Sequence, residues 1–147
     1  ISLLKADHKK VEGLFKEVAA LSDRAHQSRA KLFEKIDQEL TVHAKIEETI
    51  FYPALKAKTK RNTEPSDEVF EAYEEHANVK AMIGKLEGLA PSDETYNAKL
   101  QVLIELVKHH VKEEETEMFK QARQLLSESD LKELGERMKV AKSKLAA

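Results

Sequence analysis

One short pattern occurs twice in the chain and restricts the fold more than any other feature. A histidine is followed four residues later by a glutamate, then at once by a second glutamate, and then by an apolar pair at the eighth and ninth positions after the histidine. The two copies begin at His43 and His110. On an α-helix, residues i and i+4 lie on one face. An imidazole and a carboxylate placed in this way can bind one metal ion, so the two copies predict a metal site between helices.

The composition favours helices. Hydrophobic residues make up 41% and charged residues 35% of the 147 residues, but there are only four glycines and three prolines. A chain rich in Ala, Glu, Lys and Leu with so few helix breakers is typical of an all-α protein. The length is that of one domain with an ordinary core. We therefore predict an all-α fold and a single domain over residues 1–147.

The composition also argues against several classes of protein. The 25 basic and 27 acidic residues are interspersed without a basic stripe, so we expect no nucleic-acid partner. The absence of cysteine excludes disulfides and thiolate ligands. No apolar run approaches the roughly 18 residues that a membrane span needs, and the start shows no signal-peptide pattern. We expect a cytoplasmic protein that does not contact membranes.

Apolar residues recur at helical spacing in five segments. The predicted helices cover about residues 2–21, 27–55, 67–87, 93–126 and 130–145. Ser66 and Ser129 are predicted N-caps, Pro53 is expected to kink or end the second helix, and the clearest loop is Lys56 to Glu64, which contains Asn62. Short loops between long helices predict an up-down-up-down four-helix bundle over residues 1–126. The tail, residues 127–147, is expected to form a short fifth helix that packs across the bundle without contributing a ligand.

Each of the four long helices carries one histidine on its apolar stripe: His8, His43, His76 and His110. Counting residues from the connecting turns places the four at similar levels of the bundle, within about 5–10 Å. A lone histidine on such a stripe is most often an ordinary core residue. An inward carboxylate is rarer, because it is costly to bury unpaired. Two of the four stripes also carry one, so the set indicates a metal site.

Three further residues are candidates for roles at this site. His109 and Glu113 offer an alternative His-x-x-x-Glu register, but apolar residues flank the His110 register on both sides. Tyr52 and Tyr73 lie about one helical turn from the predicted ligands. Each tyrosine could hydrogen-bond a ligand, shield the centre or bind iron as a phenolate, and each could equally be a core aromatic residue with a satisfied hydroxyl. The acidic residues beside the predicted ligands are expected to hold the far nitrogens of metal-bound histidines or to face solvent: Glu48, Glu75, Glu113 and Glu115.

The ordered set resembles the hemerythrin-like cation-binding (HHE) domain over about residues 1–126. The residues that carry the resemblance are Asp7-His8, His43-x-x-x-Glu47-Glu48 with Phe51-Tyr52-Pro53, Glu75-His76, and His110-x-x-x-Glu114-Glu115 with Phe119. The resemblance implies a four-helix bundle that holds a non-haem di-iron centre. It implies that His8 and His43 bind one iron and that His76 and His110 bind the other. Glu47 and Glu114 would bridge the two irons together with an oxo or hydroxo group.

The sequence departs from oxygen-carrying hemerythrins in two respects. Those proteins have a second histidine on the third helix, four residues from the first, where this chain has Ala72 or Lys80. They also have an aspartate five residues after the last histidine, where this chain has Glu115, although Glu114 is the better choice of ligand. Both irons would then keep exchangeable positions, which suits the activation of small ligands. The resemblance implies a redox or stress-related protein that binds or reacts with O2, peroxide or nitric oxide, and a peroxidase-like or nitric-oxide-processing activity if it is an enzyme. The alternatives are an iron- or oxygen-sensing or O2-storage module without catalysis, and a plain bundle whose histidines are incidental.

Overall fold

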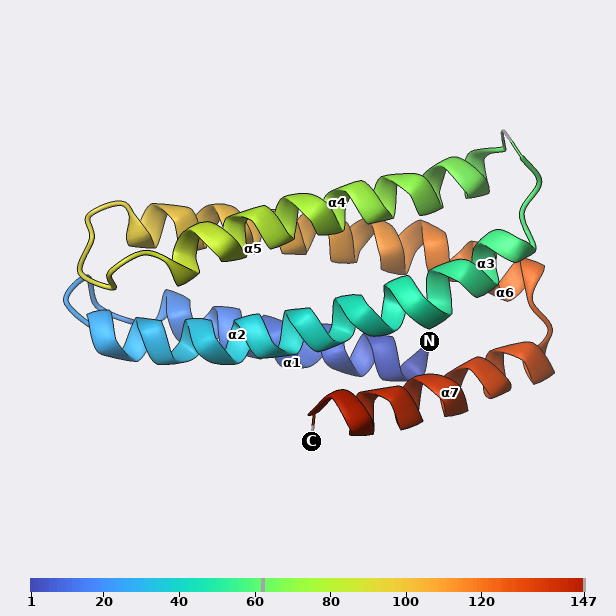
Figure 1. Ribbon diagram of the computed structural model, residues 1–147, viewed down its shortest axis with the longest axis horizontal. Helices are drawn as coiled ribbons and strands as arrows, with labels where there is room; N and C mark the ends of the chain where they lie inside the picture. Colours follow the sequence, from blue (N-terminus) through green and yellow to red (C-terminus); the bar gives the residue numbers. More distant parts are fainter. Residues whose placement is uncertain (62, 147) are drawn as a thin grey trace.

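Four long helical stretches run up and down the length of the protein (Figure 1). The stretches are α1 (Ser2–Ala19); α2 (His26–Ile46) continued by η1 (Glu47–Phe51) and α3 (Tyr52–Ala57); α4 (Glu64–Glu87); and α5 (Tyr96–Glu113) continued by η2 (Glu114–Met118) and α6 (Phe119–Leu125). This computed structural model describes residues 1–61 and 63–146, so Asn62 of the predicted loop and Ala147 of the predicted tail lie outside the described residues. The predicted all-α, up-down-up-down bundle is confirmed, while the single-domain assignment stays a prediction.

The core consists of two apolar clusters with a polar layer between them. One cluster lies toward the α1–α2 and α4–α5 turns and includes Val11, Leu40 and Val107. The other lies toward α3, α6 and the start of α1, and includes Leu4 and Met118. Burying each such side chain stabilises the fold by about 1.5–3 kcal/mol. The four predicted histidine ligands fall between the two clusters in sequence on the long helices, so the apolar packing on both sides fixes their level.

Two π-helical turns interrupt the helices that carry the repeated pattern. They span Glu47–Phe51 and Glu114–Met118, so each starts at the glutamate of a His-x-x-x-Glu pair. The N–H of Tyr52 donates to the carbonyl of Glu47, and that of Phe119 donates to the carbonyl of Glu114. Such turns are rare and occur mostly at functional sites. Pro53 does not end its helix, because it lies in the first turn of α3, where a missing N–H is tolerated, and the helix continues to Ala57. The alternative, a kink at Pro53, stays a prediction.

The last helix, α7 (Glu128–Ala146), packs against α1, α2 and η1 (Figure 1). The predicted fifth helix is confirmed, and with 19 residues it is slightly longer than the predicted range of 130–145. Ser127, not Ser129, caps it: the Ser127 hydroxyl accepts from the N–H of Asp130 at 3.0 Å, and the Asp130 carboxylate accepts from the N–H of Ser127 at 3.3 Å. This reciprocal arrangement is a capping box. The buried side chains Leu134 and Met138 attach α7 to the bundle.

Three other local predictions are wrong. Helix α4 begins at Glu64 with Pro65 in its first turn, so Ser66 is a buried helical residue and not the N-cap. Helix α5 begins at Tyr96, because the Asp93 carboxylate accepts from the N–H of Thr95 at 2.8 Å and closes a turn first. Phe70, expected on the inner stripe, is 50% exposed beneath the ammonium group of Lys56.

Within the described part of the chain, no helix is both long and apolar enough to cross a membrane.

Candidate metal centre

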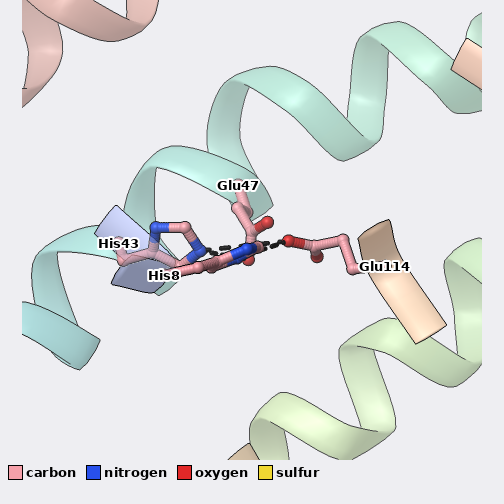
Figure 2. Close-up of side chains that lie close together, drawn as sticks. All are labelled: His8, His43, Glu47 and Glu114. Atoms are coloured by element: carbon pink, nitrogen blue, oxygen red, sulfur yellow. Dashed lines mark ion pairs between the residues drawn. The ribbon is translucent and has the colours of Figure 1, made fainter. Parts of the chain in front are cut away.

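The structure brings the six predicted ligand residues together in the polar layer. Among the described residues, three groups have ligand atoms close enough to hold a metal ion, and two of these groups lie in this layer. One consists of His8, His43, Glu47 and Glu114, and the other of Glu47, His76, His110 and Glu114. All six residues are buried. Figure 2 shows the first group, with its four side chains pointing toward one another. The two groups share both carboxylates, so Glu47 and Glu114 lie between two pairs of histidines.

The Nε2 atoms of all four histidines face these two carboxylates. Glu47 Oε1 lies 3.2 Å from the Nε2 atoms of His43 and His76. Glu114 Oε1 lies 3.0 Å from Nε2 of His8, and Glu114 Oε2 lies 3.2 Å from Nε2 of His110. Ligand atoms about 2.0–2.2 Å from one metal ion lie about 3–4 Å from each other. The spacing of these nitrogen and oxygen atoms therefore matches that of ligands around a metal.

The outward nitrogen of each histidine is held by a carboxylate from another helix. Nδ1 of His43 is hydrogen-bonded to the Asp7 carboxylate at 2.8 Å, and Nδ1 of His76 is hydrogen-bonded to the Glu48 carboxylate at 3.0 Å. The remaining pairs are Nδ1 of His110 with Glu75 at 2.8 Å and Nδ1 of His8 with Glu115 at 2.5 Å. An ionised carboxylate can only accept, so each Nδ1 carries a hydrogen and donates it. In the neutral imidazole, this leaves the Nε2 lone pair directed inward, as a metal ligand requires.

These four contacts form a closed ring around the bundle. Each carboxylate is the sequence neighbour of a predicted ligand on its own helix, and each holds the histidine of the next helix: α1 to α2, η1 to α4, α4 to α5, and η2 back to α1. Sequence reasoning expected such outer partners but did not assign their pairs. The sequence feature that indicated these partners was an acidic residue directly beside a predicted ligand in each long helix. Lys142 of α7 was missed altogether; its ammonium group donates to Asp7.

The buried carboxylates govern the protonation of this layer. Burial opposes a charge on His43, but the carboxylates of Glu47, Asp7 and Glu114 outweigh burial and raise the pKa of His43 to about 10. Burial likewise opposes a charge on His110, but Glu114, Glu47 and Glu75 raise its pKa to about 12. Burial alone would raise the pKa of Glu47, but His43 and the other neighbours hold it well below its usual value. In the metal-free protein, imidazolium protons therefore balance the charges that a metal would otherwise balance.

Tyr52 points into the second group of four. Its hydroxyl donates to Glu114 Oε2 at 2.5 Å and lies 3.2 Å from the Nε2 atoms of both His76 and His110. The π turn explains this position, because it aligns residues five apart: Tyr52 also lies 3.2 Å from Glu47 Oε1. Burial, together with Glu47 and Glu114, raises the pKa of Tyr52 well above its usual value. The phenol is therefore neutral in the metal-free protein and surrounded by predicted ligand atoms.

Phe119 occupies the corresponding place on the other half of the site. It follows Glu114 by five residues across the second π turn, and its ring stacks on His8 with centroids 5.9 Å apart and planes 4° from parallel. The two halves are thus related by an approximate repeat in both sequence and structure. At this aromatic position, the two halves differ by one hydroxyl group. The histidine pair of α1 and α2 faces a phenyl ring, whereas the pair of α4 and α5 faces a phenol.

The other two candidates do not reach the inner layer. The hydroxyl of Tyr73 donates to the backbone carbonyl of Glu48 at 3.0 Å, while its ring packs on Tyr52. The side chain of His109 is 66% exposed, and its Nε2 lies 3.1 Å from Glu113 and 3.7 Å from Glu75. The predicted preference for the His110 register agrees with this geometry, since His110 faces inward and His109 faces outward.

Two of the cavities beside the layer bear on its chemistry. A cavity of about 60 Å³ touches all four inner histidines and is otherwise lined mainly by valine, leucine and isoleucine side chains from the four long helices. A larger groove of about 360 Å³ runs between α4 and the α5–η2 stretch and reaches His110 and Glu114. The small apolar cavity suits a neutral molecule of two or three atoms, whereas the larger acidic groove suits a cation.

The buried atoms without partners are of the kinds that bind metal ions. Within residues 1–61 and 63–146, His8 Nε2, His43 Nε2, Glu47 Oε2 and Glu114 Oε1 are buried and lack a hydrogen bond of good geometry. Buried polar atoms are normally satisfied, because leaving one unpaired costs about 1–3 kcal/mol. Four such atoms at one point, all of ligand type, fit a metal site.

Comparisons with known proteins agree with this site. A model of the hemerythrin HHE cation binding domain matches residues 1–122. A protein named DNA nickase from Nostoc sp. is 29% identical over 143 residues; the match covers 97% of this chain, which spans only 39% of that protein. The crystal structure of a hemerythrin HHE cation binding domain-containing protein, the Rv2633c homolog from Mycobacterium kansasii, has a TM-score of 0.82 and 26% identity, covering 98% of this chain and 85% of that one. The matched range includes all six predicted ligand residues, and this chain belongs to the hemerythrin HHE cation-binding domain family.

Proposed function

We propose that this chain is a non-haem di-iron protein that binds or reacts with dioxygen, peroxide or nitric oxide. One observation carries the proposal: two buried groups of two histidines and two glutamates share both glutamates. In this assignment, His8 and His43 hold one iron, His76 and His110 hold the other, and Glu47 and Glu114 bridge the pair. Sharing of both carboxylates supports two ions over one. Imidazole and carboxylate are suitable iron ligands, and the sequence has no cysteine that would favour another ligand set.

The protein's own residues prepare the site for such a pair. The ring of outer carboxylates fixes the direction of each imidazole, which in metal sites typically improves affinity 10- to 100-fold per contact. Iron with exchangeable positions supplies redox chemistry toward small oxygen- or nitrogen-containing ligands. The apolar cavity beside the histidines supports a small neutral ligand, because its lining offers few hydrogen bonds to hold water or an anion. A cytoplasmic location belongs to the same proposal.

Tyr52 makes the two halves of the site unequal. Its hydroxyl lies among four predicted ligand atoms of the second group, so we expect it to bind the ion between His76 and His110 as a phenolate. A bound dication reverses the effect of burial on a nearby acid and favours the ionised form. The expected signature is a visible phenolate-to-iron charge-transfer band that is absent in Tyr52→Phe. An unchanged spectrum would assign Tyr52 to hydrogen bonding alone.

The reactivity is tested with the iron-loaded protein. The ferrous form is prepared anaerobically and then mixed with O2, H2O2 or nitric oxide in separate experiments, and the optical spectrum and ligand consumption are followed together. A spectral change at the iron with at least one ligand, absent in Glu47→Gln, is expected. Repeated turnover of peroxide or nitric oxide would identify an enzyme, whereas one stoichiometric change would favour sensing or storage. A spectrum that no ligand alters would contradict the proposal.

A sensing role has one observation in its favour. Lys142 of α7 donates to Asp7, and Asp7 accepts from Nδ1 of His43, so the last helix is two contacts from the centre. Iron occupancy that shifts His43 would then alter how α7 packs. Limited proteolysis and thermal melting of the iron-loaded and iron-free forms test this role. Equal protection of α7 in both forms would count against it.

DNA nicking is a separate candidate that rests on the name of one relative. The groove that reaches the centre has acidic residues at eight of its eleven lining positions, and none of these lining residues is lysine or arginine. A phosphate backbone would be repelled there, since DNA binding depends on neutralising phosphates with cationic side chains. Incubation of the iron-loaded protein with supercoiled plasmid tests the activity. We expect no nicked circles above those produced by the same iron concentration without protein.

A further inference from the structure

The acidic groove beside the centre has no role in holding the inner pair. It lies between α4 and the α5–η2 stretch and has a volume of about 360 Å³. Its carboxylates are crowded: burial, followed by the neighbouring charge of Glu117, raises the pKa of Glu68 to about 7. Glu68 Oε2 also lacks a hydrogen-bond partner among the described residues. Such a negative surface with few internal partners attracts cations from solution.

The groove leads from solvent to the inner centre. Its inner end is Glu114, which is 2% exposed and whose Oε1 has no hydrogen bond of good geometry within the described residues. Its lining also includes His110 and, nearer the surface, Glu75 and Glu113. The apolar cavity touches the same histidines but offers a cation no carboxylate lining beyond Asp7. Of the two cavities, the acidic groove is the one suited to passage of a metal ion.

A third group of ligand-type side chains stands at the mouth of this groove. It consists of Glu75, His109 and Glu113, whose nearest ligand atoms all lie within 4.8 Å of one another. Nε2 of His109 is 3.1 Å from Glu113 Oε1 and 3.7 Å from Glu75 Oε2. These separations match those of ligands about 2.1 Å from one ion. One imidazole and two carboxylates, partly exposed, suit a divalent cation that keeps water at its other positions.

Glu75 joins this outer group to the inner centre. Its Oε2 faces His109, while its Oε1 accepts from Nδ1 of His110, a predicted ligand of the inner pair. His109 and His110 are adjacent in sequence, so their side chains point about 100° apart on the same helical turn, and each lies beside one oxygen of Glu75. A cation held outside would therefore stand one side chain from the inner ligands.

We propose that Glu75, His109 and Glu113 form an outer binding site for a divalent metal ion, from which iron passes along the acidic groove to the buried centre. This inference rests on the proposed di-iron function for its destination but not for the outer site itself. The outer site binds more weakly than the inner one, because two of its three side chains are exposed and water competes for the ion. It exchanges ions with solvent while the inner centre retains them.

The test uses metal-free protein and Co²⁺ alone as the probe. Bound Co²⁺ at the inner centre is followed by its visible absorption, and the outer ion by paramagnetic shifts of the His109 ring protons. The test variant is His109→Ala with Glu113→Gln, and the matched control is His26→Ala, which removes a histidine at the start of α2. The wild type and control should bind two Co²⁺ tightly and a further one weakly. The test variant should lose only the weak site and fill the inner centre about tenfold more slowly at limiting metal, a loss within the range of electrostatic steering.

The outcomes separate the two proposals. A His109 shift that stops growing once the inner absorption is complete would overturn the outer site. A lost outer site with an unchanged filling rate would overturn the route. If His109 shifts but the inner absorption never develops in the wild type, the di-iron function fails while the outer site stands. High salt should slow filling in the wild type and the control, and should slow it less in the test variant, which keeps the other carboxylates of the groove.

Discussion

The metal-free protein should lose stability as the pH rises from about 7 to 9.5, whereas the iron-loaded protein should not. His43 has a folded-state pKa of about 10, against 6.5 for an unperturbed histidine. A group whose pKa is raised by folding stabilises the folded state fully below its unfolded pKa, and this contribution disappears as the pH rises through its folded pKa. The pH window of the loss is therefore about 6.5 to 10.

The expected loss is large compared with the stability of a typical domain. At about 1.4 kcal/mol per pH unit, His43 alone contributes about 4 kcal/mol at pH 7 and about 1 kcal/mol at pH 9.5. His110, with a pKa of about 12, changes in the same direction. The two histidines share Glu47 and Glu114, so their effects do not add in full. We expect the free energy of unfolding to fall by at least about 3 kcal/mol, against a total of about 5–15 kcal/mol.

Urea unfolding at several pH values between these limits measures the loss directly. His43→Gln should be less stable at pH 7 but should lose less between pH 7 and 9.5, because one titrating group is gone. His26→Gln should keep the wild-type slope. In the iron-loaded protein the imidazoles are neutral ligands, and stabilisation by iron should grow with pH since fewer protons compete. A metal-free stability that is constant or rises over this range would refute the proposed balance of buried charges.

Three further predictions follow from the outer contacts. Glu48→Gln removes the carboxylate that holds Nδ1 of His76; iron affinity measured by chelator competition should fall about 10- to 100-fold. Lys142→Met leaves the buried carboxylate of Asp7 without its lysine partner; iron release to a chelator should be faster, and Lys142→Arg should restore it. Met138→Ala empties part of the contact between α7 and the bundle; the free energy of unfolding should fall by about 2–5 kcal/mol.

Each of these predictions has an outcome that contradicts it. Unchanged iron affinity in Glu48→Gln would mean that the ring of carboxylates does not orient the histidines. Iron release from Lys142→Met at the wild-type rate would separate α7 from the centre. A loss in Met138→Ala below about 1 kcal/mol would mean that α7 packs too loosely to contribute to the core. Replacing exposed Lys139 with Met gives a control for the loss of a lysine on the same helix.

The fold and the inner layer could be predicted from sequence because the evidence is local and repeated. The apolar spacing identified five helices, and the level of one histidine on each long helix placed the ligands together. The same spacing wrongly placed Phe70 on the inner stripe, whereas its ring lies at the surface against the ammonium group of Lys56. A periodic pattern records which residues can face inward, while the crossing of neighbouring helices decides which of them do.

The π turns could not be predicted from a regular helical period. Tyr52 follows Glu47 by five residues, and in an ordinary α-helix its side chain would point away from that of Glu47. One π turn brings the two residues onto one face and directs the phenol at the centre. The pairing of Asp7 with His43 and of Lys142 with Asp7 depends on tertiary packing between helices distant in sequence. Such pairings have no signal in a single sequence beyond the presence of the charged residues.

The central claim is that two iron ions share Glu47 and Glu114. A crystal structure of the aerobically purified protein, with an anomalous difference map recorded at the iron absorption edge, tests this claim most directly. We predict two iron peaks roughly 3–4 Å apart, one beside His8 and His43 and the other beside His76 and His110, with both glutamates in contact with both peaks. A single peak, or a peak that appears at the zinc edge and not at the iron edge, would contradict the account.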